Sequence, residues 1–136
     1  MKKQPSGDPA GPFRWYLGFM AAACGGALLW QAFLPELAGL YSSWGVAAGW
    51  QREIALWNVE LVAAILCALL GKDLRAMKIL TLQSTVLCWA LGAHHLAALA
   101  ARPSPQYGIH LLGVLEVMLL GGVWGAAVLL RARKQK

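Results

Sequence analysis

Four long apolar runs divide this chain of 136 residues, and short segments rich in proline, glycine, serine or charge separate them. The runs cover approximately residues 15–34, 50–70, 79–101 and 109–130. Each is close to the roughly 20 residues that a helix needs to cross about 30 Å of hydrocarbon. The pattern predicts an all-α integral membrane protein whose four transmembrane helices form an up-down-up-down bundle with short links.

The separating segments contain residues that end or begin helices. Pro35 stops the first run, and Ser42 or Ser43 can cap the helix that contains the second. Gly71-Lys72-Asp73 predicts a tight hairpin between the second and third spans. Arg102-Pro103-Ser104-Pro105 breaks the chain before the fourth span. These short links favour antiparallel neighbours.

Basic residues are distributed unevenly between the two sides of the predicted bundle. Ten of the twelve Lys and Arg residues lie before the first span, around residues 71–78 or after the fourth span, and only Arg52 and Arg102 lie on the other side. Loops rich in Lys and Arg stay on the cytoplasmic side of a membrane. We therefore expect both termini and the turn at 71–78 to lie in the cytoplasm.

Composition supports a membrane protein and argues against a nucleic-acid partner. Hydrophobic residues make up 59% of the chain and charged residues 13%, whereas a soluble domain carries about 25% charged residues. The net charge of +6 comes mainly from residues that flank the spans, which suits contact with anionic lipid. We expect residues 13–131 to form one membrane domain between a flexible cytoplasmic tail, 1–12, and a basic cytoplasmic tail, 132–136.

Aromatic residues near the ends of the spans predict contacts with lipid headgroups, because tryptophan and tyrosine are enriched where a membrane meets water. The expected anchors are Trp15, Trp44, Trp50 and Tyr107. The bilayer is therefore the first partner that the sequence predicts.

Small residues recur every four positions on two of the spans. Gly18, Ala22 and Gly26 do so on the first, and Gly121 and Gly125 do so on the fourth. This spacing lets helix backbones approach closely in lipid. We expect both stripes to pack within the chain, and self-association into a homo-oligomer is the alternative.

Six ionisable residues lie in the apolar runs or at their outer edges, where a charge is expensive and therefore suggests a functional site. They are Glu53, Glu60, His94, His95, His110 and Glu116. At about 1.5 Å per residue, a deeper set lies roughly 9 Å below the outer ends of the spans and comprises Glu60, His94 or His95, and Glu116. Glu53 and His110 form a shallower layer. The sequence thus predicts an outward-facing His/Glu site.

Helical phase divides these candidates further. Glu53 and Glu60 are seven residues apart and share one face of the second span, whereas Asn58 lies on a different face. His110 and Glu116 are six residues apart and do not share a stripe. The spacing favours a smaller site, made by Glu60, Glu116 and one of the two adjacent histidines, over one tight site with all six residues.

Several chemical roles fit a mixed set of imidazole and carboxylate groups. Such ligands suit transition metals, and the candidate metal ligands are His94, His95, Glu60 and Glu116. The Glu-x-x-His spacing of di-metal bundle proteins is absent, which leaves a mononuclear site or haem ligation by one histidine. A proton relay is a further role. The structural alternative is that these groups only hydrogen-bond to one another and hold the helices together.

Three segments together resemble a known family: Gln51-Arg52-Glu53-Ile54-Ala55-Leu56-Trp57-Asn58, Gly92-Ala93-His94-His95 and Leu115-Glu116-Val117. They are similar to elements of small bacterial membrane proteins that are themselves similar to the DoxX-like four-helix membrane proteins. The resemblance covers roughly Trp50–Val123 and implies the same four-helix fold in a bacterial inner membrane, but no particular reaction. The site residues that it implies are Glu53, Asn58, His95 and Glu116.

Three functions compete on these observations. The first is a binding or accessory protein, either a subunit of a larger membrane complex or a holder of an apolar ligand, a quinone-like molecule or a pigment at the outward-facing site. The second is a membrane-embedded metal-dependent or redox enzyme, with a transition metal or haem as the cofactor. The third is a proton-coupled transporter that acts as a dimer. The small size and the absence of a catalytic motif favour the first.

Overall fold

The computed structural model describes residues 8–134, which fold into helices joined by short turns. The helices are α1 Gly11–Phe33, α2 Pro35–Leu40, α3 Ala48–Leu70, α4 Leu74–Ala101, α5 Gly108–Leu112, η1 Gly113–Val123 and α6 Trp124–Lys134. η1 is a π-helix, and α5, η1 and α6 follow one another without a break. Within residues 8–134, four helices are long and apolar enough to cross a membrane: α1, α3, α4 and the composite helix Gly108–Lys134. The prediction of four apolar helices of membrane-spanning length is confirmed.

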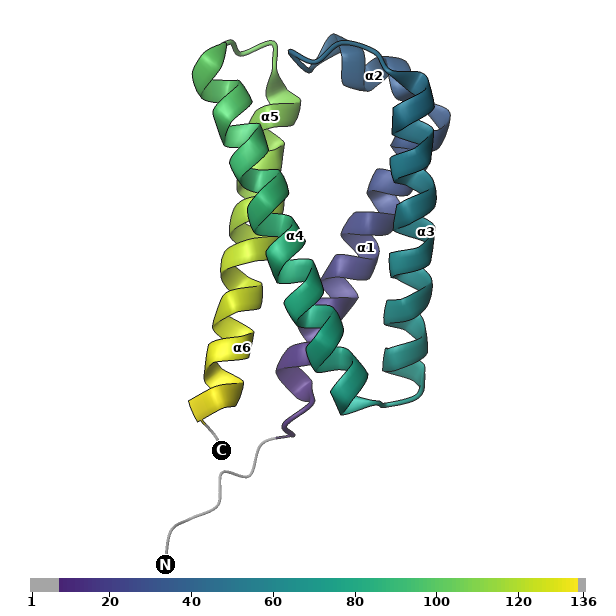
Figure 1. Cartoon of the computed structure of the whole chain (residues 1–136), viewed down its shortest axis with the longest axis vertical. Helices are drawn as coiled ribbons and strands as arrows, with labels where there is room; N and C mark the ends of the chain where they lie inside the picture. The colour runs from purple at the N-terminus through teal and green to yellow at the C-terminus, as the bar shows by residue number, and fades with distance from the viewer. Residues whose placement is uncertain (1–7, 135–136) are drawn as a thin grey trace, which may run out of the picture.

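The helices form two pairs that cross. α1 packs chiefly against α3, and α4 packs chiefly against η1. Figure 1 shows the pairs crossing in the lower half of the molecule, where α1 contacts α4, and diverging toward the upper end. Both ends of the described chain and the α3–α4 turn lie at the lower end, whereas α2 and the α4–α5 loop lie at the upper end.

The α3–α4 turn forms the tight hairpin that its sequence predicts. Lys72 adopts a left-handed conformation with a φ of 52°, which reverses the chain directly after α3. The Asp73 carboxylate then accepts hydrogen bonds from the backbone amides of Arg75 and Ala76, at 2.9 and 3.0 Å. These bonds satisfy amides that have no partner within the first turn of a helix, so Asp73 is the N-cap of α4.

The start of α3 differs from the prediction. Neither Ser42 nor Ser43 caps this helix, because its N-cap residue is Ala47, which has no side chain to accept a hydrogen bond. Both serines lie in the loop between α2 and α3, where their polar groups bind other partners. This loop positions the candidate site described below.

Helices extend into both predicted tails. α1 begins at Gly11, inside the segment 1–12, and α6 continues to Lys134, inside the segment 132–136. The remainder of each predicted tail lies outside the described residues. The last turn of α6 carries Arg133 and Lys134 of the predicted C-terminal tail, and cations are favourable there because of the helix dipole.

Small residues of the fourth span allow its backbone to lie close to α1 and α4 where the helix pairs cross. A side chain added at Gly125 would meet Thr85 and the ring of Tyr16, and one added at Gly121 would meet the sulfur of Cys88. Tyr16 is fully buried, and its hydroxyl donates a hydrogen bond to the Gly121 carbonyl at 2.8 Å. The expectation that the small residues of the fourth span pack within the chain is confirmed.

The small residues of α1 have the opposite environment. Gly18, Ala22 and Gly26 are all exposed, and a side chain added at either glycine would meet nothing within 4 Å. The expectation of packing within the chain is therefore wrong for this stripe. The physical reason is that α1 buries a different face, which carries Phe13, Tyr16, Leu17, Met20 and Cys24.

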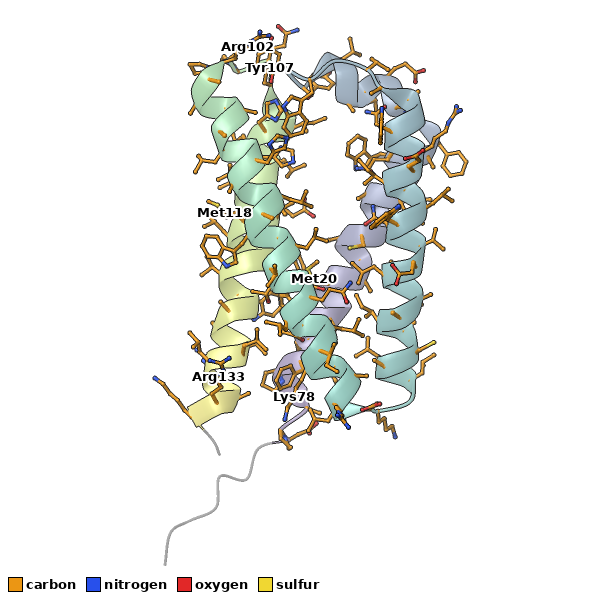
Figure 2. The ribbon with its side chains drawn as sticks, in the orientation of Figure 1. Met20, Lys78, Arg102, Tyr107, Met118 and Arg133 are labelled. Atoms are coloured by element: carbon orange, nitrogen blue, oxygen red, sulfur yellow. The ribbon has the colours of Figure 1, made fainter. Side chains whose placement is uncertain are left out.

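Large apolar side chains cover the outside of the helices. Trp15, Phe33 and Leu70 are examples, with exposed fractions of 79%, 75% and 82%. An apolar surface of this extent suits lipid rather than water. Figure 2 shows Lys78 and Arg133 at the lower end of the molecule and Arg102 at the upper end, so charged side chains occur on both sides of the apolar band.

Candidate functional site

Three histidines gather around Trp44 at the upper end of the molecule. The Trp44 ring lies 4.6 Å from the ring of His94, 4.9 Å from that of His95 and 4.5 Å from that of His110, measured between centroids. His94 and His95 belong to α4, His110 belongs to α5, and Trp44 lies in the loop before α3. We call these four residues the Trp44–histidine cluster. It joins three segments that are distant in sequence.

Hydrogen bonds within the cluster assign the protons of two histidines. The backbone N–H of Ser43 donates to Nε2 of His110 at 3.0 Å, so this nitrogen is an acceptor. A neutral imidazole carries its proton on the other nitrogen. His110 therefore donates from Nδ1 to Nδ1 of His95, which lies 3.2 Å away. His95 must then be neutral as well, with its own proton on Nε2.

The two adjacent histidines of α4 have different environments. His95 is half-buried and bonded to His110, whereas His94 is exposed and lies nearly parallel to Trp44, with 18° between the ring planes. Among the described residues, no side-chain hydrogen bond involves His94. His95 is therefore the histidine that faces the interior of the cluster.

Polar groups of the α2–α3 loop hold Trp44 over the histidines. Ser42 is buried, and its hydroxyl accepts a hydrogen bond from the Trp44 amide at 3.0 Å. The Ile109 amide donates to the Tyr41 carbonyl at 3.3 Å, which ties the same loop to α5. Ser43 adds its hydroxyl to the cluster, 2.9 Å from Nε2 of His110. The loop thus positions one aromatic ring and two hydrogen-bonding groups.

A glycine in η1 makes room for the inner histidine. Gly113 is buried, and a side chain added there would collide with the imidazole of His95. The close approach of the η1 backbone to α4 thus holds the His95 ring in position from one side, while His110 holds it through a hydrogen bond.

None of the carboxylates predicted to share this site forms a hydrogen bond with a cluster histidine within residues 8–134. Glu53 and Glu60 are exposed on α3, and Glu116 is half-buried on η1. Asn58, another residue predicted for this site, is half-buried on α3. At 1.5 Å per residue, Glu60 lies roughly 18 Å from the first residue of α3, whereas His95 lies roughly 9 Å from the last residue of α4. The common depth expected for Glu60 and His95 does not hold, because α3 begins six residues before Ile54.

The depth of His110 relative to the other histidines also differs from the prediction. His110 was expected in a shallower layer than the other histidines, but it is hydrogen-bonded to His95 and fully buried. Within residues 8–134, no group of three or more His, Cys, Asp or Glu side chains is placed to hold a metal ion. The observed cluster is one of imidazole and aromatic rings, and its geometry gives no support to a mixed His/Glu metal site.

Sequence reasoning missed two residues of the site and assigned a third only as an anchor. Ser43 and Gly113 were not among the candidates, although Gly113 follows His110 by three residues and so lies on the same side of that helix. Trp44 was expected at the headgroup level. It remains 49% exposed, and it also forms the centre of the cluster. The ring of Tyr107, another expected anchor, lies 6.1 Å from that of His110 between centroids, with 60° between the ring planes.

In chemical terms, the cluster offers a half-buried hydrogen-bond donor, on His95, beside one flat apolar surface. The Nε2–H of His95 has no acceptor among the described residues, and the indole of Trp44 is half-exposed.

The likeness to DoxX-like proteins inferred from short segments of the sequence stays a prediction. Comparison of the chain with protein-family models, with curated proteins and with solved structures finds no match.

Proposed function

We propose that this chain is an integral membrane protein that binds a planar apolar molecule with a hydrogen-bond acceptor, such as a quinone-like molecule, at the Trp44–histidine cluster. The observation that carries this proposal is the proton assignment of His95, which leaves an unpaired donor at Nε2 beside the Trp44 ring. A ligand that stacks on the indole and accepts from the imidazole would satisfy both groups.

The environment of the cluster supports an apolar ligand. The surrounding helices expose large hydrophobic side chains, and His95 lies roughly 9 Å along α4 from its outer end, so a molecule dissolved in lipid has direct access. No Glu is hydrogen-bonded to a histidine within the described residues, which makes ligand binding a better fit than proton transfer through Glu60 and Glu116.

We infer an up-down-up-down topology in a bacterial inner membrane, with both termini in the cytoplasm. Of the basic residues in the described part of the chain, seven lie near the end that holds the termini and two, Arg52 and Arg102, lie near the other end. Such a difference orients membrane proteins with the richer end inside. In this orientation, the Trp44–histidine cluster faces the outside.

Single cysteines test this orientation. We expect a cysteine at Ser104, in a background where the three native cysteines are alanine, to react with an impermeant maleimide on intact cells. A cysteine at Arg133 should react only after lysis. The reverse pattern would place the cluster on the cytoplasmic side.

Ligand titration tests the binding proposal itself. We expect a short-chain benzoquinone to bind the purified protein in mild detergent, measured by calorimetry, and Trp44→Ala or His95→Ala to weaken binding about tenfold or more. Tenfold corresponds to about 1.4 kcal/mol, which is the scale of one aromatic contact or one hydrogen bond. Trp50→Ala is the matched control, since Trp50 is 72% exposed in α3 at the same end of the molecule and should bind like the wild type.

The proposal is contradicted if the two cluster variants bind the benzoquinone as well as Trp50→Ala does. It is also contradicted if the wild type binds no planar acceptor and organic extraction of the purified protein yields no bound small molecule.

A further inference from the structure

An exposed stripe runs along α3 on the side away from its buried face. Its members are spaced alternately by four and three residues: Gly49, Glu53, Leu56, Glu60, Ala63 and Cys67, all of them exposed. The buried residues of α3 are Ala55, Leu61, Ile65 and Ala68. A spacing of four and three keeps one continuous seam on a helix, which is the pattern by which a second helix packs along it.

Glu60 lies at the middle of this stripe, and no basic side chain of the described residues forms an ion pair with it. It is roughly 18 Å along the helix from Ala48 and roughly 15 Å from Leu70. In the part of the chain that the structure describes, the one ion pair joins Arg14 to Asp8, and Glu60 forms no hydrogen bond. A carboxylate that faces lipid at mid-membrane is strongly unfavourable, so this position calls for a partner.

The surroundings of Glu60 indicate the chemistry of that partner. Leu56, Trp57 and Glu60 line an open hollow of about 310 Å³ on the surface of α3. The Trp57 side chain is 76% exposed. A carboxylate beside an exposed indole is suited to an ammonium or guanidinium group, which pairs with the carboxylate and lies against the aromatic face.

We propose that this stripe docks a transmembrane helix of another membrane protein that carries Lys or Arg near its centre. Charge complementarity selects this partner over a second copy of the chain. All basic residues of the described chain lie near helix ends or in turns, so a second copy in the same orientation would place Glu60 against Glu60. The basic headgroup of a lipid does not reach a position this far from both ends of α3. The surface is separate from the ligand site and does not depend on it.

Association with a defined peptide tests the inference. The probe is a 23-residue Leu/Ala transmembrane peptide with one central Lys, labelled as a fluorescence acceptor, in phosphatidylcholine vesicles with the labelled full-length protein. We expect energy transfer to show at least tenfold tighter association with this peptide than with a peptide whose central residue is Leu. Glu60→Gln should remove the preference, because it keeps the side-chain shape and deletes the charge.

Glu116→Gln is the matched control, since Glu116 is the carboxylate of another span and is half-buried on η1. It should keep the preference for the Lys peptide, and circular dichroism should show the same helix content in both variants. Equal association of Glu60→Gln and the wild type with the Lys peptide would overturn the proposal. The proposal would also be overturned if the wild type associated with itself in the absence of peptide and Glu60→Gln abolished that association. A second copy of the chain would then occupy the stripe.

Discussion

Replacing His110 with alanine is expected to lower the free energy of unfolding by about 2–4 kcal/mol. The His110 side chain is fully buried, accepts from the Ser43 amide and donates to His95. Its ring also contacts those of Trp44 and Tyr107. The substitution leaves a cavity and removes the partners of two polar groups, and each of these losses is destabilising. Denaturant unfolding in mild detergent, followed by circular dichroism, measures the change.

Two further measurements separate this role from a general loss of packing. The amide of Ser43 should exchange hydrogen faster in His110→Ala, because its acceptor is gone. His94→Ala is the control, since His94 is exposed and only stacks on Trp44, and it should cost less than about 1 kcal/mol. Equal stability of His110→Ala and the wild type, with a protected Ser43 amide, would show that the hydrogen-bonded cluster does not hold the loop.

Features that depend on local composition were predictable from the sequence. The length of each apolar run gives the four helices, because the hydrocarbon thickness fixes how many residues a span needs. Pro35 and the 71–73 hairpin act through the backbone of their own neighbours, and they end helices where expected. The prediction that the fourth-span glycines pack closely holds as well, because Gly121 and Gly125 lie one turn apart in a crowded crossing.

The candidate site depends on features that such patterns do not contain. The expected face of Glu116 assumed 3.6 residues per turn, but η1 is a π-helix, whose wider turns shift the phase of the residues after Gly113. The sequence identified His94, His95 and His110 as unusual, but their meeting point is set by the fold of the α2–α3 loop. That loop forms hydrogen bonds with α5 through the Tyr41 carbonyl and the Ser43 amide. Both bonds join segments that are far apart in sequence, so no local pattern predicts them.

Two stripes of small residues with the same spacing have different environments in the fold, and the sequence alone does not distinguish them. Gly18, Ala22 and Gly26 have the same four-residue spacing as Gly121 and Gly125, but the first set is exposed and the second is buried. Spacing gives the face of a helix but not the direction in which that face points. Only the crossing of the helix pairs assigns the first stripe to the outside and the second to the core.

Replacing Gly125 with leucine is expected to have the largest effect on stability, a loss of about 3 kcal/mol or more. The new side chain would collide with Thr85 of α4 and Tyr16 of α1, so it would force the two helix pairs apart. Separation would also break the hydrogen bond from Tyr16 to the Gly121 carbonyl. We expect a low yield of folded protein in detergent and a clearly lower midpoint of unfolding.

Gly26→Leu is the matched control, because it is the same substitution at a glycine beside open space. It should leave the midpoint of unfolding unchanged if the α1 stripe faces lipid, and a loss of dimer without a loss of stability would show that the stripe mediates self-association. A Gly125→Leu variant as stable as Gly26→Leu would mean that the helix pairs do not cross closely at Tyr16. The contrast between the two glycines therefore tests the packing that holds the helix pairs together, independently of any ligand.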